Sequence, residues 1–224
     1  MSVNTKAWFG LIFLAAVMCI MLFVPAGTVY YLPAWVYLAI FFGASILITI
    51  YLIKYDPELL RRRVSAGPTA EQKTTQKIIM LFAMIGFVAL LVVPALDYRF
   101  GWSRVPIALI ALGDVLVAAG FYIVFLVYRE NTFTSATIEI MQDQKVISSG
   151  PYAIVRHPMY AGGLLLLLGM PLALSSYWGL LAFVAMTPIL LLRLYDEETF
   201  LCKHLSGYIE YQRKVPSRII PGVF

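Results

Sequence analysis

The residues that could carry out chemistry in this sequence lie in two polar segments near its C-terminal end, 144–160 and 193–221. Arg193 and Glu197 in the second segment are four residues apart, so they share one face of a helix. His157 in the first segment is a group that can bind a charged ligand or transfer a proton. These residue types therefore predict either binding of a charged ligand or acid–base chemistry.

The same residues also have simpler interpretations, and the spacing alone does not choose between them. An Arg193–Glu197 pair is typical of a salt bridge at the mouth of a membrane helix, and a single His157 is often structural. Pro158 directs His157 away from the helical conformation, which indicates a shaped loop before the next helix. The two histidines, His157 and His204, have no Cys or His neighbour at ligand spacing, so we expect no metal site. No glycine-rich phosphate loop and no serine nucleophile elbow occur.

The composition defines the elements that must position these residues. Of the 224 residues 61% are hydrophobic and 13% are charged, and the mean hydropathy is +0.84. Soluble domains have about 45–50% apolar and about 25% charged residues. The sequence therefore predicts an all-α integral membrane protein, because too little polar surface remains to coat a soluble domain.

About six apolar segments have the length or flanking residues of membrane helices. They are Trp8–Val24, Pro33–Ile53, Ile78–Val93, Ile107–Tyr128, Ala161–Leu174 and Trp178–Tyr195.

The last two of these segments form one apolar stretch, Ala161–Tyr195. A single helix of this length would run about 52 Å, against a hydrocarbon core of about 30 Å. Gly169-Met170-Pro171 and Ser175-Ser176 predict a break near its middle. We therefore expect a helical hairpin that brings His157 and Tyr160 close to Arg193 and Glu197.

The positive charges predict the orientation of the chain. Fifteen of the 17 lysines and arginines fall in segments 1–7, 54–77, 129–160 and 193–224. Basic residues favour the cytosolic side, so both termini are expected there. The net charge of +5 is thus a topology signal, and we expect no nucleic-acid partner.

Two charged features of the sequence each have two interpretations. The run Arg61-Arg62-Arg63 is typical of the flank of a membrane helix, and it could also bind anionic lipid headgroups. Asp114 is the only acid inside a predicted span, where a carboxylate can be structural or functional.

The order of several motifs resembles the isoprenylcysteine carboxyl methyltransferase family. The resemblance covers about residues 137–224 and rests on Gly150-Pro151-Tyr152, Arg156-His157-Pro158-Met159-Tyr160, Glu197-Glu198, Gly207-x-x-x-Tyr211 and Val215-Pro216-x-Arg218. The closing sequence Val-Pro-Ser-Arg-Ile-Ile-Pro at 215–221 resembles the form of the bacterial-type members, so the bacterial inner membrane is the expected location.

The resemblance implies S-adenosylmethionine as cofactor, held in a cytosolic cup made by the C-terminal third of the chain. It implies two regions, membrane helices over 1–128 and a catalytic region over 129–224. The implied substrate-side pair is Arg193 and Glu197, with Arg193 holding the substrate and Glu197 orienting Arg193. The implied cofactor contacts are Gln144, Lys145, Val146, Ile147, Tyr152, His157, Pro158, Met159 and Tyr160.

The implied reaction is methyl transfer to a lipophilic or prenylated substrate, such as an isoprenoid thioether that carries a carboxylate. A carboxylate is ionised at neutral pH and needs no general base. A thiol or an amine would need one, and His157 or Glu198 would be the candidates. The alternatives are an NADPH-dependent membrane reductase, with the same helical architecture, and a non-catalytic membrane transporter or scaffold.

Overall fold

The computed structural model describes residues 2–64, 74–135, 137–138, 140–141 and 143–224, and this part of the chain is helical with connecting loops. The predicted all-α membrane fold is confirmed. The helices are α1 (Val3–Ala26), α2 (Leu32–Tyr55), α3 (Pro57–Val64), α4 (Thr74–Phe100), α5 (Ile107–Glu130), α6 (Pro158–Ala173), α7 (Trp178–His204) and α8 (Tyr208–Lys214), with a short 3₁₀ helix at Gly150–Ala153.

Five of the described helices, α1, α2, α4, α5 and α7, are long and apolar enough to cross a membrane. The helix α6 is apolar but shorter, with 16 residues. The division of the chain at residue 128 stays a prediction; α5 continues to Glu130 and packs along α6.

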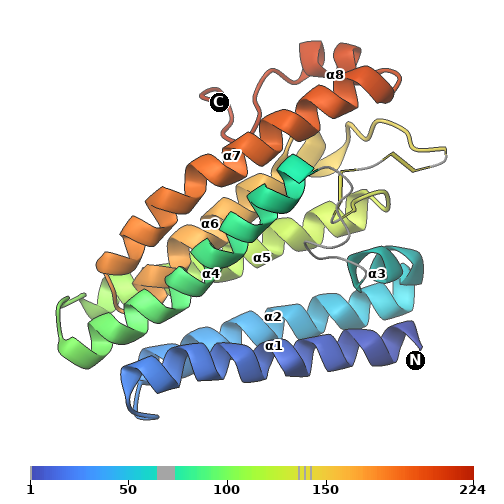
Figure 1. Cartoon of the computed structure of the whole chain (residues 1–224). Coiled ribbons are helices and arrows are strands. Elements are labelled where there is room, and N and C mark those ends of the chain that lie inside the picture. The colour runs from blue at the N-terminus through green and yellow to red at the C-terminus, as the bar shows by residue number, and fades with distance from the viewer. Residues whose placement is uncertain (1, 65–73, 136, 139, 142) are drawn as a thin grey trace.

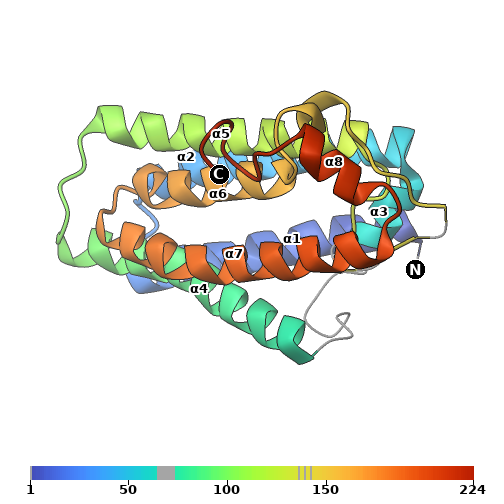
Figure 2. The same ribbon diagram turned by 90° about the horizontal axis from the view of Figure 1, so that it is seen from above.

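Successive long helices run in alternating directions, which gathers the polar ends of several of them (Figures 1 and 2). The N-terminus, α3 and α8 lie at the same end of the bundle, and α5 lies beside α6 while α4 lies beside α7. The C-terminal end of α5, the start of α6 and the end of α7 therefore meet there. The hairpin of α6 and α7 is the element that joins the two polar segments of the sequence.

One proline does not end its helix where the sequence predicts it. The predicted span Ile78–Val93 stops before Pro94, yet α4 continues through Pro94 to Phe100. The predicted end of the first hairpin arm at Leu174 is confirmed to within one residue, since α6 ends at Ala173. The helices pack closely at Pro94 and Pro171, since a Cβ added to Gly179 of α7 would lie 2.7 Å from Pro171 and 2.8 Å from Pro94. The hairpin turn comes a few residues later, with Ser175 in the left-handed region at φ 58°.

The end of the bundle opposite α3 and α8 is fastened by a buried acid, Asp97. Its carboxylate accepts hydrogen bonds from the amide of Ser103 at 2.7 Å, from the Ser103 hydroxyl at 2.6 Å and from the Ser176 hydroxyl. Asp97 lies beyond the predicted span 78–93, and it belongs to a long apolar helix because α4 extends past Pro94. One carboxylate oxygen of Asp114 is buried with no hydrogen-bond partner among the described residues, and its role stays open.

Candidate active site

A cavity of about 470 Å³ lies where the polar ends of α5, α6 and α7 meet. Cavities that bind small molecules measure roughly 300–1,000 Å³. The cavity brings together all eleven residues that the sequence predicts for the site, although their roles stay predictions. These residues are Gln144, Lys145, Val146, Ile147, Tyr152, His157, Pro158, Met159, Tyr160, Arg193 and Glu197.

The C-terminal tail builds one wall of the site by pairing with the loop before α6. The amide of Arg156 donates to the carbonyl of Ser217 at 2.9 Å, and the amide of His157 donates to that of Arg218 at 2.8 Å. His157 itself has a non-helical backbone, with Pro158 at the first turn of α6. The backbone bonds therefore hold the His157 side chain at the helix entrance, as the His-Pro sequence indicates.

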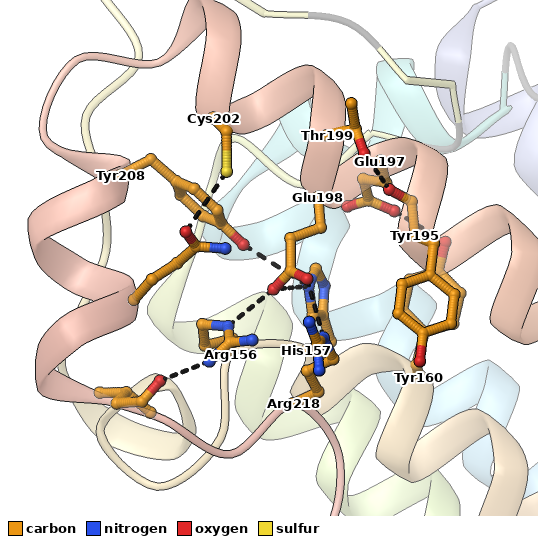
Figure 3. A network of polar contacts seen from close by, with 12 residues as sticks. Arg156, His157, Tyr160, Tyr195, Glu197, Glu198, Thr199, Cys202, Tyr208 and Arg218 are labelled. Carbon is orange, nitrogen blue, oxygen red and sulfur yellow. Dashed lines mark hydrogen bonds and ion pairs between the residues drawn. The ribbon is translucent and has the colours of Figure 1, made fainter. Parts of the chain in front are cut away.

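Glu198 of α7 joins this loop and the tail through three basic groups (Figure 3). Its carboxylate accepts a hydrogen bond from Arg156 Nε at 2.7 Å and one from Arg218 Nε at 2.8 Å, and it lies 3.6 Å from His157 Nε2. Arg156 also donates to the carbonyls of Val215 at 2.8 Å and Pro216 at 2.6 Å. The hydrogen bond to Glu198 raises the pKa of Arg218, which therefore stays charged.

A second group of contacts surrounds the predicted substrate-side pair. The Tyr160 hydroxyl donates to Glu197 at 2.7 Å, and Arg193 Nη1 donates to Gln76 Oε1 at 2.7 Å. Gln76 is buried at the start of α4 and donates in turn to Asp196. Arg193 is thus held by a residue 117 positions earlier in the chain, which no local spacing could predict.

Tyr152 is held from both ends. Its hydroxyl accepts a hydrogen bond from Asn131 Nδ2 at 2.9 Å, and its carbonyl accepts one from the Tyr211 hydroxyl at 2.7 Å. Burial raises the pKa of Tyr152, and it raises that of Tyr211 to about 12. Both phenols therefore stay protonated at neutral pH and act as hydrogen-bonding groups.

The cavity also has an apolar wall that extends between the membrane helices. Met80 and Ala83 of α4, Leu164 and Leu167 of α6 and Leu190 of α7 line it. One cavity therefore offers a charged end and an apolar end, which suits a ligand with a polar head and a lipophilic tail.

Sequence reasoning missed three residues of this site, Arg63, Gln76 and Asn131, and it also missed the clamping role of Glu198. The Glu197-Glu198 motif marks Glu198, but the sequence offers it only as an alternative base. Arg63 and Asn131 line the cavity, whereas Gln76 acts on it through its contact with Arg193.

Comparisons with known proteins agree with the class that this geometry indicates. A model of the phospholipid methyltransferase family matches residues 108–206, from the start of α5 to just beyond α7. Over 148 residues the chain is 28% identical to protein-S-isoprenylcysteine O-methyltransferase B of Arabidopsis thaliana. That match covers 63% of this chain and 72% of the plant protein.

The helical membrane fold and these similarities define the class: the protein is an integral membrane methyltransferase. More closely, the two matches support the isoprenylcysteine carboxyl methyltransferase family that the motifs predict. This assignment favours the methyltransferase over the reductase, transporter and scaffold alternatives.

Proposed function

We propose that the protein transfers a methyl group from S-adenosylmethionine to the carboxylate of a lipophilic substrate at the cytosolic face of a membrane. The observation that carries the proposal is the cavity, in which a charged end and an apolar wall meet. The plant relative's name supplies the substrate class, an isoprenylcysteine.

The residues that line the polar end suit S-adenosylmethionine chemically. Tyr152, His157 and Tyr160 offer aromatic rings of the kind that attract a cationic centre such as a sulfonium. The amides of Val146 and Ile147 donate to no described residue, so they are available to the edge of a nucleobase. Lys145 and Arg193 add positive charge to the polar end of the cavity.

The cofactor, when bound, supplies an activated methyl group on sulfur, and the protein's part is to orient the acceptor toward it. Arg193, held through Nη1 by Gln76, binds the acceptor carboxylate. Glu197 is four residues from Arg193 on α7 and accepts a hydrogen bond from the Tyr160 hydroxyl. This bond joins α6 to α7 beside the cavity. Alignment of two reactants supplies about 7–11 kcal/mol in favourable cases.

The proposed acceptor needs no general base, and the contacts of Glu198 are consistent with that. A terminal carboxyl has a pKa of about 3.3–3.7 and is ionised at neutral pH. An amine or thiol acceptor would require a base, yet both Glu198 oxygens already accept hydrogen bonds from arginines. This arrangement leaves His157 as the remaining candidate base for an amine acceptor, whereas a carboxylate acceptor needs neither residue as a base.

The orientation and location complete the proposal. The basic residues favour a cytosolic position for both termini and for the cavity. The closing sequence Val-Pro-Ser-Arg-Ile-Ile-Pro at 215–221 supports the bacterial inner membrane. In this arrangement the water-soluble cofactor arrives from the cytosol, and the lipophilic tail comes from the bilayer.

The test is calorimetric titration of the detergent-purified protein with S-adenosylhomocysteine, with NADPH titrated in parallel. We expect micromolar binding of S-adenosylhomocysteine that His157→Ala and Tyr160→Ala each weaken at least about tenfold, or about 1.4 kcal/mol. Tyr122→Ala, at an exposed position on α5, is the matched control and should bind normally. Binding of NADPH without binding of S-adenosylhomocysteine would refute the proposal.

Labelled methyl transfer then identifies the acceptor. N-acetyl-S-farnesylcysteine should be methylated, and its methyl ester, which lacks the free carboxylate, should not be. Methylation of phosphatidylethanolamine, without methylation of N-acetyl-S-farnesylcysteine, would show that the acceptor is an amine and not a carboxylate.

A further inference from the structure

The short helix α3 connects the N-terminal half of the chain to the cavity, outside the region that the family model matches. Asp56 caps α3 by accepting a hydrogen bond from the Leu59 amide at 2.9 Å. Leu59 and Leu60 are buried in a cluster that includes Leu52 and Tyr128. The apolar face of α3 is thus fixed against the bundle.

The polar residues around α3 hold segment 131–135, which follows α5. Asp56 accepts a hydrogen bond from the Thr132 hydroxyl at 2.6 Å, and Arg62 donates to the Thr132 carbonyl. Arg63 Nη1 donates to the Ser135 carbonyl at 3.2 Å, and its guanidinium lies 5.3 Å from the centre of the Tyr128 ring. Because Asn131 and Ser135 of this segment line the cavity, α3 forms its outer support.

Arg63 differs from its two neighbours because it reaches the cavity itself. Arg61 and Arg62 both pair with Glu58, at 2.5 Å and 3.3 Å. Among the described residues, no carboxylate lies within ion-pair distance of Arg63. A half-buried guanidinium that has five donors and no anionic partner is costly to desolvate unless a ligand supplies the anion.

Both reactants of the proposed reaction carry a carboxylate that could be the anionic partner of Arg63, so this inference rests on the proposed function. The donor carries an amino-acid carboxylate and the acceptor carries a second one. Of the cations that line the described cavity, Arg156 is already bound to Glu198 and Lys145 is exposed to solvent. Arg193 can hold one carboxylate, and Arg63 remains for the other.

We propose that Arg63 is a ligand-binding residue of the cavity and binds a carboxylate group, either that of the acceptor or the amino-acid carboxylate of the methyl donor. The N-terminal half of the chain would thereby take part in substrate or cofactor recognition. A planar guanidinium suits a carboxylate because it donates two parallel hydrogen bonds.

The experiment compares Arg63→Gln and Arg63→Lys with Arg62→Gln, which weakens the hold on segment 131–135 without changing a cavity cation. For each variant the Kd of S-adenosylhomocysteine is measured by calorimetry, and the KM of N-acetyl-S-farnesylcysteine by methyl transfer. We expect Arg63→Gln to raise either this Kd or this KM by about tenfold to a hundredfold, which is the effect of losing a hydrogen bond between charged groups. Arg63→Lys should recover part of that loss, because it keeps the charge.

The two sources of the carboxylate give different results. A raised Kd for S-adenosylhomocysteine assigns the contact to the donor, and a raised KM with normal Kd assigns it to the acceptor. Equal effects of Arg62→Gln and Arg63→Gln, or no effect of Arg63→Gln, would overturn the inference. If the wild-type protein neither binds S-adenosylhomocysteine nor turns over, the proposed function itself fails and this inference fails with it.

Discussion

At the scale of single residues, the site is built from side chains whose partners fix their direction. Arg193 is bound by Gln76, Tyr160 donates to Glu197, and Tyr152 is held by Asn131 and Tyr211. These contacts reduce the conformational freedom that ligand binding would otherwise remove, which is how a preformed site gains affinity and rate.

Arg193→Ala should lower kcat/KM for the carboxylate acceptor by about a hundredfold or more, since it removes a charge-assisted contact and its orientation. The Kd of S-adenosylhomocysteine should change less than about twofold if Arg193 serves the acceptor. Gln76→Ala should give a smaller loss of the same kind, because Arg193 remains but is less well held. Methyl-transfer kinetics and calorimetry measure both effects, and equal losses in the two quantities would contradict the role of Arg193.

Removal of the Glu198 carboxylate should destabilise the cytosolic end of the protein. Glu198→Ala leaves buried Arg156 without its counter-ion, and breaking a buried ion pair of this kind costs about 3–5 kcal/mol. The thermal unfolding midpoint in detergent should fall, and protease should cleave the C-terminal tail faster. Glu210→Ala, an exposed acid on α8, is the control, and an equal effect there would argue against a special role for Glu198.

At the scale of elements, the position of the site depends on the close packing of α5 and α6. A Cβ at Gly120 would lie 2.6 Å from the carbonyl oxygen of Gly162, and one at Gly169 would lie 2.7 Å from that of Gly113. Small residues allow membrane helices to approach this closely. Since His157 precedes α6 and Asn131 follows α5, this contact also sets the distance across the cavity.

Gly120→Ala should therefore destabilise the protein by about 1–3 kcal/mol, the usual cost of overpacking. Gly43→Ala is the matched control, because no atom lies within 4 Å of its added Cβ and alanine favours the helix. Thermal unfolding in detergent measures both variants. Equal unfolding midpoints for the two variants would show that α5 and α6 can move apart at no cost in the free energy of unfolding.

At the scale of the whole molecule, the alternating helices place α8 and the loop between α1 and α2 at opposite ends (Figure 1). A cysteine at Ser206 should be labelled by a membrane-impermeant reagent from the cytosolic side only, and one at Val29 from the opposite side only. Both side chains are exposed, and the background would carry Cys19→Ala and Cys202→Ala. The reverse pattern would overturn the orientation that the basic residues predict.

Hydropathy, charge and motif order in the sequence determined the membrane class, the approximate helices and the hairpin. The resemblance of the motifs to the family also predicted eleven of the residues that line the cavity. The predicted helix end before Pro94 was wrong, because α4 continues through this proline to Phe100.

Only the tertiary structure decided which distant residues meet. Gln76 contacts Arg193, the tail pairs with Arg156 and His157, and Arg63 reaches the cavity. These contacts depend on how helices pack and how far loops reach, and no spacing along the chain encodes either. The sequence therefore determined the kind of site, and the packing of the helices decided its complete set of residues.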